Sequence, residues 1–210
     1  VTVSGNITMN GGPNRNAIRF SGAGTLNIGG AISGGDLEST VGSTVNYNGT
    51  APQTVVMNND YIYTNLSINN TAGATLGDTI SAARVTETIS VGEVTMGSIF
   101  NTNNLAVARG GADAIIVAAG STLNAGTTSI TWGSVAGTIT INGTFQTANT
   151  AGFSGAAARA INFVNSPAIT LGSSSTIEYN ALVGQQVTER TYNNLALSGS
   201  GNKTINGALT

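Results

Sequence analysis

Acid–base chemistry in this chain depends on nine aspartates and glutamates, because the sequence contains neither histidine nor cysteine. Hydrolysis of a glycosidic bond requires two carboxyl groups about 5–10 Å apart, on either side of the bond. Asp36 and Glu38 are the only pair with the i,i+2 spacing that places two side chains on one face of a strand. They lie in a glycine-rich stretch that is expected to be a loop. We therefore expect no catalytic residues and no enzymatic activity, with the carboxylates acting as solvated surface charges.

Metal and cofactor sites are also not expected. Without histidine, the chain can form neither a Ser-His-Asp triad nor a histidine-based metal site, and without cysteine it has no thiolate ligands. Two acidic segments, 58–60 and 36–38, carry oxygen ligands suited to Ca²⁺, but neither has an EF-hand or a glycine-rich nonapeptide frame. We expect no metal, no cofactor and no disulfide.

Tyrosine is the residue type that suggests ligand contact. Exposed aromatic rings stack on sugar rings, so the five tyrosines are candidates for a carbohydrate-binding surface. In the alternative interpretation, Tyr47 and Tyr179 pack along the edge of the core, because they are in phase with Val45 and Ile177. Packing is the favoured interpretation. The candidate sugar contacts are Tyr47, Tyr61, Tyr63, Tyr179 and Tyr192.

All five tyrosines belong to a passage that occurs twice. The first copy begins Ser-Thr-Val-Asn-Tyr-Asn at residues 43–48, and the second begins Ser-Thr-Ile-Glu-Tyr-Asn at 175–180. The spacing from Tyr47 to Gln53 equals the spacing from Tyr179 to Gln185. Apolar and polar residues alternate in both copies, which predicts strands with one buried face. The repeated spacing predicts a repeated strand–turn–strand geometry.

Other segments extend the repeat. Residues 141–145 (Ile-Asn-Gly-Thr-Phe) resemble residues 3–7 (Val-Ser-Gly-Asn-Ile), and residues 160–163 resemble residues 17–20. The offset between matched positions drifts, as expected when loops change length and strands do not. We interpret 1–210 as one continuous segment of about one and a half units, 1–137 and the start of a second at 138–210. The chain opens and stops within strand-like runs, so we expect it to be a fragment of a longer protein.

Short strands separated by Gly and Asn turns are typical of a sandwich, a barrel or a solenoid. The small and β-branched apolar residues suit a narrow stacked core, and Asn near the turns can bridge successive coils as an amide ladder. We therefore predict an all-β fold, a parallel β-solenoid (right-handed β-helix), with tandem β-sandwiches as the alternative. At roughly 20 residues per coil, the chain would form about ten coils.

Charge restricts the partners. Only 8% of the residues are charged and the formal net charge is −2, with seven basic residues scattered along the chain. This pattern argues against binding to nucleic acid. The chain also contains no run of about 18 apolar residues, so membrane insertion is not expected. The expected partners are further repeats of the same chain or other copies of it, together with surface glycans.

The second copy resembles a known type of repeat. Residues 184–188 (Gly-Gln-Gln-Val-Thr) and 192–204, together with 175–180, are similar to repeats of very large surface proteins of Bacteroidota that the type IX system secretes. The similarity covers 173–210 and, more loosely, 42–81. These proteins include gliding proteins and adhesins. The resemblance implies export to the extracellular cell surface, a long stalk and an adhesive role.

These observations together predict a structural stalk or filament segment of an extracellular bacterial adhesin. The alternatives are a carbohydrate-binding domain and a polysaccharide-degrading β-helix. The first requires exposed tyrosines on one face. The second requires carboxylates distant in the sequence to meet on adjacent coils.

Overall fold

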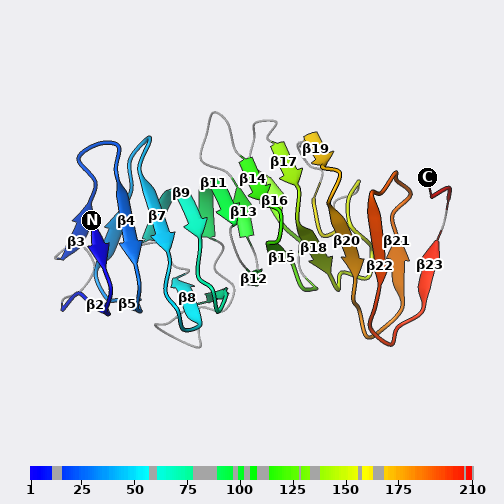
Figure 1. Cartoon of the computed structure of the whole chain (residues 1–210), viewed down its shortest axis with the longest axis horizontal. Helices are drawn as coiled ribbons and strands as arrows, with labels where there is room; N and C mark the ends of the chain where they lie inside the picture. Colours follow the sequence, from blue (N-terminus) through cyan, green and yellow to red (C-terminus); the bar gives the residue numbers. More distant parts are fainter. Residues whose placement is uncertain are drawn as a thin grey trace.

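The architecture is built from short parallel strands that stack along one axis, with the two termini at opposite ends (Figure 1). The structure, a computed structural model, describes residues 1–10, 16–56, 61–77, 89–96, 99–101, 105–107, 114–127, 129–132, 138–155, 158–162, 168–205 and 207–209. All regular secondary structure in these ranges is β-strand.

Two long sheets run along the molecule. The 12-stranded sheet follows the order β1-β4-β7-β9-β11-β14-β17-β19, with β3, β6, β13 and β16 joined at its side. Its strands are β1 (Thr2–Val3), β3 (Ala17–Arg19), β4 (Thr25–Ile28), β6 (Asp36–Glu38), β7 (Thr44–Tyr47), β9 (Tyr61–Ile68), β11 (Ile89–Met96), β13 (Leu105–Val107), β14 (Ala114–Val117), β16 (Thr131–Trp132), β17 (Thr138–Ile141) and β19 (Ala168–Leu171).

The seven-stranded sheet has the order β22-β20-β18-β15-β12-β10-β8, and two further sheets pair β2 with β5 and β21 with β23. Their strands are β2 (Ile7–Thr8), β5 (Ile32–Ser33), β8 (Gln53–Val56), β10 (Ala74–Gly77), β12 (Ile99–Asn101), β15 (Thr122–Asn124), β18 (Thr144–Thr147), β20 (Thr176–Tyr179), β21 (Gln185–Val187), β22 (Asn194–Leu197) and β23 (Lys203–Ile205).

Each of these strand pairings is parallel, and each strand pairs with strands of the preceding and following turns rather than with its sequence neighbours. A chain that returns to the same sheet in the same direction after each turn forms a solenoid. The prediction of an all-β parallel β-solenoid is confirmed, and the alternative of tandem sandwiches is not observed.

The number of turns differs from the expectation. The strands stack in about seven turns rather than about ten. Turn length varies more than a uniform coil allows: Thr176 lies beside Asn194 of the next turn, only 18 residues later, whereas Thr144 lies beside Thr176, 32 residues later. The strands that pair here, β18, β20 and β22, have four residues each, so the segments between them account for this variation.

The core lies between the sheets and follows the period-two pattern of the strands. In β7 the side chains of Val45 and Tyr47 are buried, and in β20 those of Ile177 and Tyr179 are buried. Parallel register places like residues above one another, as where Tyr47 is flanked by residues 28 and 68 of the adjacent turns. The continuous apolar interior that results removes hydrocarbon surface from water at every turn, at about 25 cal/mol for each Å².

In the described part of the chain, no helix has the length and apolar character that a membrane span requires.

Candidate functional site

The duplicated passage forms the same constellation twice, and we call it the tyrosine–glutamine motif. In the first copy it consists of Tyr47, Gln53 and Tyr63, and in the second of Tyr179, Gln185 and Tyr192. Each copy begins on a strand that alternates buried and partly exposed residues, β7 or β20. The last residue of this strand is the first tyrosine of the motif, and its side chain points into the core. The next strand, β8 or β21, begins with the glutamine.

The two tyrosines of each copy meet inside the solenoid. The hydroxyl oxygens of Tyr47 and Tyr63 are 2.8 Å apart, and those of Tyr179 and Tyr192 are also 2.8 Å apart. The ring centroids are separated by 6.4 Å in the first copy and 6.5 Å in the second. A hydroxyl buried in an apolar core needs a hydrogen-bond partner, and each tyrosine supplies one to the other.

The second tyrosine of each pair also donates to the backbone. Tyr63 donates to the carbonyl of Val56 at 3.1 Å, and Tyr192 donates to the carbonyl of Thr188. Val56 and Thr188 occupy the same place, three residues after the motif glutamine. The pair therefore holds the last residue of β8, or the residue after β21, against the strand that precedes it.

The glutamine joins successive turns. Gln53 Nε2 donates to the carbonyls of Ile28 and Gly30 at 2.8 and 2.7 Å, on the turn before its own. Gln185 Nε2 donates in the same way to the carbonyls of Thr147 and Asn149, at 2.8 and 3.0 Å.

The same side chain also closes the turn on which it lies. Gln53 Oε1 accepts from the backbone N–H of Gly49 at 2.8 Å, and Gln185 Oε1 accepts from that of Ala181 at 3.1 Å. Each glutamine thus satisfies backbone groups at the corner where a strand ends and the chain turns. Buried backbone groups without partners would destabilise such a corner.

The tyrosine rings are not available as a sugar-binding surface. Tyr47, Tyr61, Tyr63 and Tyr179 are buried, and Tyr192 is only partly exposed. Burial raises the pKa of Tyr47, Tyr63 and Tyr192 above the ordinary value, since the charged phenolate is disfavoured away from water. The interpretation favoured from the sequence, in which the tyrosines pack in the core, therefore agrees with the burial of Tyr47, Tyr61, Tyr63 and Tyr179.

Polar side chains on the outer face form a ladder across the turns. Asn46 Nδ2 donates to Asn27 Oδ1 at 2.8 Å, Asn27 Nδ2 donates to Thr2 Oγ1 at 3.1 Å, and Asn69 Nδ2 donates to Asn46 Oδ1 at 3.0 Å. This is the amide ladder predicted from the abundance of Asn. On the other long sheet, Glu178 extends the arrangement by accepting from Gln146 at 2.8 Å and from Ser198 at 2.6 Å.

The carboxylate pair singled out from the sequence lies on a strand, so the loop expected there is wrong. Gly34 and Gly35 adopt positive φ and make the turn, which allows 36–38 to form β6 beside β3. Asp36 is buried, and Glu38 accepts two hydrogen bonds from Arg19, at 2.8 and 3.1 Å. This ion pair lowers the pKa of Glu38, an effect opposite to the raised pKa of a general acid.

Within the described ranges, no three Asp, Glu, His or Cys side chains gather as metal ligands would. The candidate Ca²⁺ segment 58–60, which contains Asp60, lies outside the described residues.

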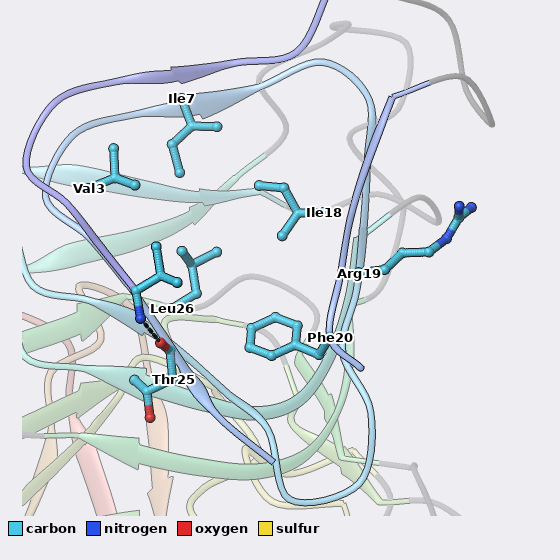
Figure 2. Close-up of a pocket in the computed structure, with 8 residues that line it drawn as sticks. Val3, Ile7, Ile18, Arg19, Phe20, Thr25 and Leu26 are labelled. Atoms are coloured by element: carbon cyan, nitrogen blue, oxygen red, sulfur yellow. Dashed lines mark hydrogen bonds between the residues drawn. The ribbon is translucent and has the colours of Figure 1, made fainter. Parts of the chain in front are cut away.

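An apolar cavity of about 300 Å³ opens at the N-terminal end of the stack. Figure 2 shows Val3, Ile7, Ile18, Phe20 and Leu26 around it, with the Arg19 side chain directed away. These are core positions of the first turns: Val3 pairs with Ile28 of the next turn, and Ile7 pairs with Ile32. The cavity thus exposes apolar core positions at this end of the stack.

Comparisons with protein-family models, with curated proteins and with solved structures find no match to this chain.

Proposed function

We propose that the chain is a structural stalk or filament segment of an extracellular bacterial adhesin, which extends a binding region away from the cell surface. The observation that carries the proposal is the stacking of parallel strands from one end of the chain to the other, in two sheets that follow the long axis (Figure 1). Each turn contacts its neighbours, so length can increase by adding turns without redesign of the core.

The contacts between turns suit a load-bearing rod. Backbone hydrogen bonds, the glutamine contacts and the outer amide ladder all connect one turn to the next. A pull along the axis would have to break several of these contacts together. The resemblance of residues 173–210 to surface-protein repeats supports export to the cell surface and adhesion as the setting of the rod.

The test is a replacement in the bacterium that produces the protein. Exchange of this segment for an unrelated rod of equal length should preserve adhesion, and its removal should reduce adhesion because the binding region is brought closer to the cell. Antibody labelling of intact cells should detect the segment at the surface. Loss of adhesion with the unrelated rod would show that the segment itself binds, which contradicts a stalk role.

The partner that we propose for the open end is another coil of the same kind, either from further repeats or from a second copy. The apolar cavity at the N-terminal turns supports this, because it exposes core positions. Light scattering of the isolated chain should show association that increases with concentration. A monomer at high concentration would contradict self-association, and it would leave the stalk proposal to the replacement experiment.

We assign no catalytic step to the chain. The carboxylate pair with strand spacing is divided between a buried Asp36 and an ion-paired Glu38, which supports this assignment. Incubation with a panel of polysaccharides should release no reducing sugar, and release by the purified chain would restore the enzyme alternative.

A further inference from the structure

Two arginines that are distant in the sequence meet at one serine. Arg159 Nη1 donates to the backbone carbonyl of Ser154, and Arg190 Nη1 donates to Ser154 Oγ at 3.4 Å. Arg190 Nη2 also donates to the carbonyl of Ile169 at 3.1 Å. Ser154 is buried, and both arginines are partly exposed. Both guanidinium groups therefore bond to the same residue at the border of the core, and each remains partly accessible from solvent.

The guanidinium group of Arg190 packs against the aromatic ring of Phe153. Its guanidinium carbon lies 5.8 Å from the centre of the Phe153 ring, within the range of a cation–π contact. Burial lowers the pKa of Arg190, because removal of water disfavours its charge. Nearby, burial raises the pKa of Tyr192, and the positive charges of Arg190 and Arg159 both act in the opposite direction. Both charges therefore act on the same small region.

A pair of like charges at this border normally has an acidic partner. Among the residues that the structure describes, the one ion pair is Arg19–Glu38, and neither Arg159 nor Arg190 has a carboxylate within 4 Å. The acceptors that these two arginines use are two backbone carbonyls and one hydroxyl, all neutral. A guanidinium group carries several N–H donors in a plane, so donors remain for another acceptor.

We propose that Arg159 and Arg190 form a binding site for an oxyanion, a carboxylate or sulfate group, which is either carried by an acidic sugar or free in solution. Planar guanidinium groups match the two oxygens of such a group with paired hydrogen bonds. An anion would also neutralise two neighbouring positive charges, one of which is held in a partly desolvated position. The proposal does not depend on the stalk function.

The experiment is a calorimetric titration of the 210-residue chain with sodium sulfate, then with sulfated, carboxylated and neutral oligosaccharides of one backbone. Arg159→Gln removes one charge at a partly exposed position, and Arg190→Lys keeps the charge but loses the planar donors. The matched control is Arg19→Gln, which removes an arginine of equal charge that is already paired with Glu38. Circular dichroism verifies that each variant is folded.

We expect saturable binding of the oxyanion that weakens about tenfold or more in Arg159→Gln and Arg190→Lys and is unchanged in Arg19→Gln. Tighter binding of an acidic oligosaccharide than of sulfate would identify a sugar-borne group, and equal binding would identify the free ion. Either result supports the site. Lack of saturable binding, an equal loss in Arg19→Gln, or equal binding of the neutral oligosaccharide would overturn it.

Discussion

The two copies of the tyrosine–glutamine motif have the same local geometry but lie on different faces of the solenoid. In the first copy, the strand that carries Tyr47 belongs to the 12-stranded sheet, between β4 and β9. In the second copy, the strand that carries Tyr179 belongs to the seven-stranded sheet, between β18 and β22. The tyrosine pair and the glutamine contacts are nevertheless the same in kind and nearly the same in length.

The segment before each copy explains the change of face. In the first half, the chain passes from β4 through β5 and through β6, at the side of the 12-stranded sheet, before β7 joins the main path of that sheet. In the second half, β19 of the same sheet is followed directly by β20, after a short turn over residues 172–175. Between β19 and β20 no strand takes the place of β5 and β6, so the motif is reached one face earlier.

The comparison separates two kinds of information in the sequence. The spacing within the motif determines which groups meet, and this geometry survives a change of sheet. The number of residues between motifs determines which face of the rod the motif joins. In a longer array, outward residues of successive copies would therefore face different sides, as Asn46 and Glu178 already do on two separate sheets.

The largest expected effect comes from removing the second tyrosine of each copy. Tyr63 is fully buried, whereas Tyr192 is only partly buried. Tyr63→Ala should lower the free energy of unfolding by about 3–5 kcal/mol, because a large cavity remains in the core. Tyr192→Ala should cost clearly less. Chemical denaturation followed by circular dichroism measures both, and equal losses would contradict the difference in burial.

A smaller effect is expected from the glutamines. Gln53→Ala should cost about 1–3 kcal/mol, because the carbonyl of Gly30 and the N–H of Gly49 would lose their partner and the carbonyl of Ile28 would lose one of its two. Gln185→Ala should cost slightly less, since Gln53 Oε1 accepts an additional bond from Asn70 Nδ2 at 2.7 Å.

The amide hydrogen of Gly49 should exchange faster with solvent in Gln53→Ala, and that of Ala181 should exchange faster in Gln185→Ala. The exposed neighbour Gln186 provides the control, and Gln186→Ala should leave both rates unchanged. If neither rate responds to its own glutamine, the proposed role of this side chain at the corner is wrong.

Alkaline pH should weaken both copies. Burial raises the pKa of Tyr47, Tyr63 and Tyr192 in the folded chain above the value of about 10 in the unfolded chain. Between these values the folded state holds more protons, so the free energy of unfolding is unaffected below pH about 10 and falls above it. The slope is about 1.4 kcal/mol per pH unit for each of the fully buried Tyr47 and Tyr63, and it is smaller for the partly exposed Tyr192, because water screens its charge.

The double variant Tyr47→Phe/Tyr63→Phe removes two of these groups and should make the alkaline decline less steep. The matching variant Tyr179→Phe/Tyr192→Phe should have a smaller effect on the slope, because Tyr192 is less buried. Unfolding midpoints measured from pH 8 to pH 12 test this. An unchanged slope in the first variant would show that other groups dominate.

The periodicity of the sequence was sufficient to predict those parts of the fold that depend on the local pattern of apolar and polar residues. Alternation over 44–47 and 176–179 predicted the buried faces of β7 and β20, and the equal spacing to Gln53 and Gln185 predicted a repeated geometry. The sequence could not predict the carbonyls to which the glutamines donate. These depend on the length of the turn, which places Ile28 beside Gln53 and Thr147 beside Gln185. The meeting of Arg159 with Arg190 depends on stacking in the same way.

One expectation was wrong for a reason of local packing. The glycines before Asp36 indicated a loop, but they form only the turn, and parallel pairing with β3 extends the chain at 36–38. Gly34 is suited to that turn, since a Cβ atom there would lie 2.2 Å from the carbonyl oxygen of Met9. For Tyr47 and Tyr179 the phase with Val45 and Ile177 favoured packing over a sugar surface, and both side chains are buried.

The smallest expected effect concerns the outer ladder, where the two copies differ in chemistry. Asn46 bonds to neutral amides on both sides, whereas Glu178 accepts from Gln146 and Ser198 with a charged carboxylate. Asn46→Ala should cost about 0.5–1.5 kcal/mol, because partly exposed amide bonds are replaced by water. Glu178→Gln keeps the size of the side chain and removes its charge. It should cost a similar amount, because an amide keeps only one acceptor oxygen for the two donors Gln146 and Ser198. Chemical denaturation tests both variants, and an unchanged free energy of unfolding in Glu178→Gln would mean that the second carboxylate oxygen contributes nothing to the contact between its turns.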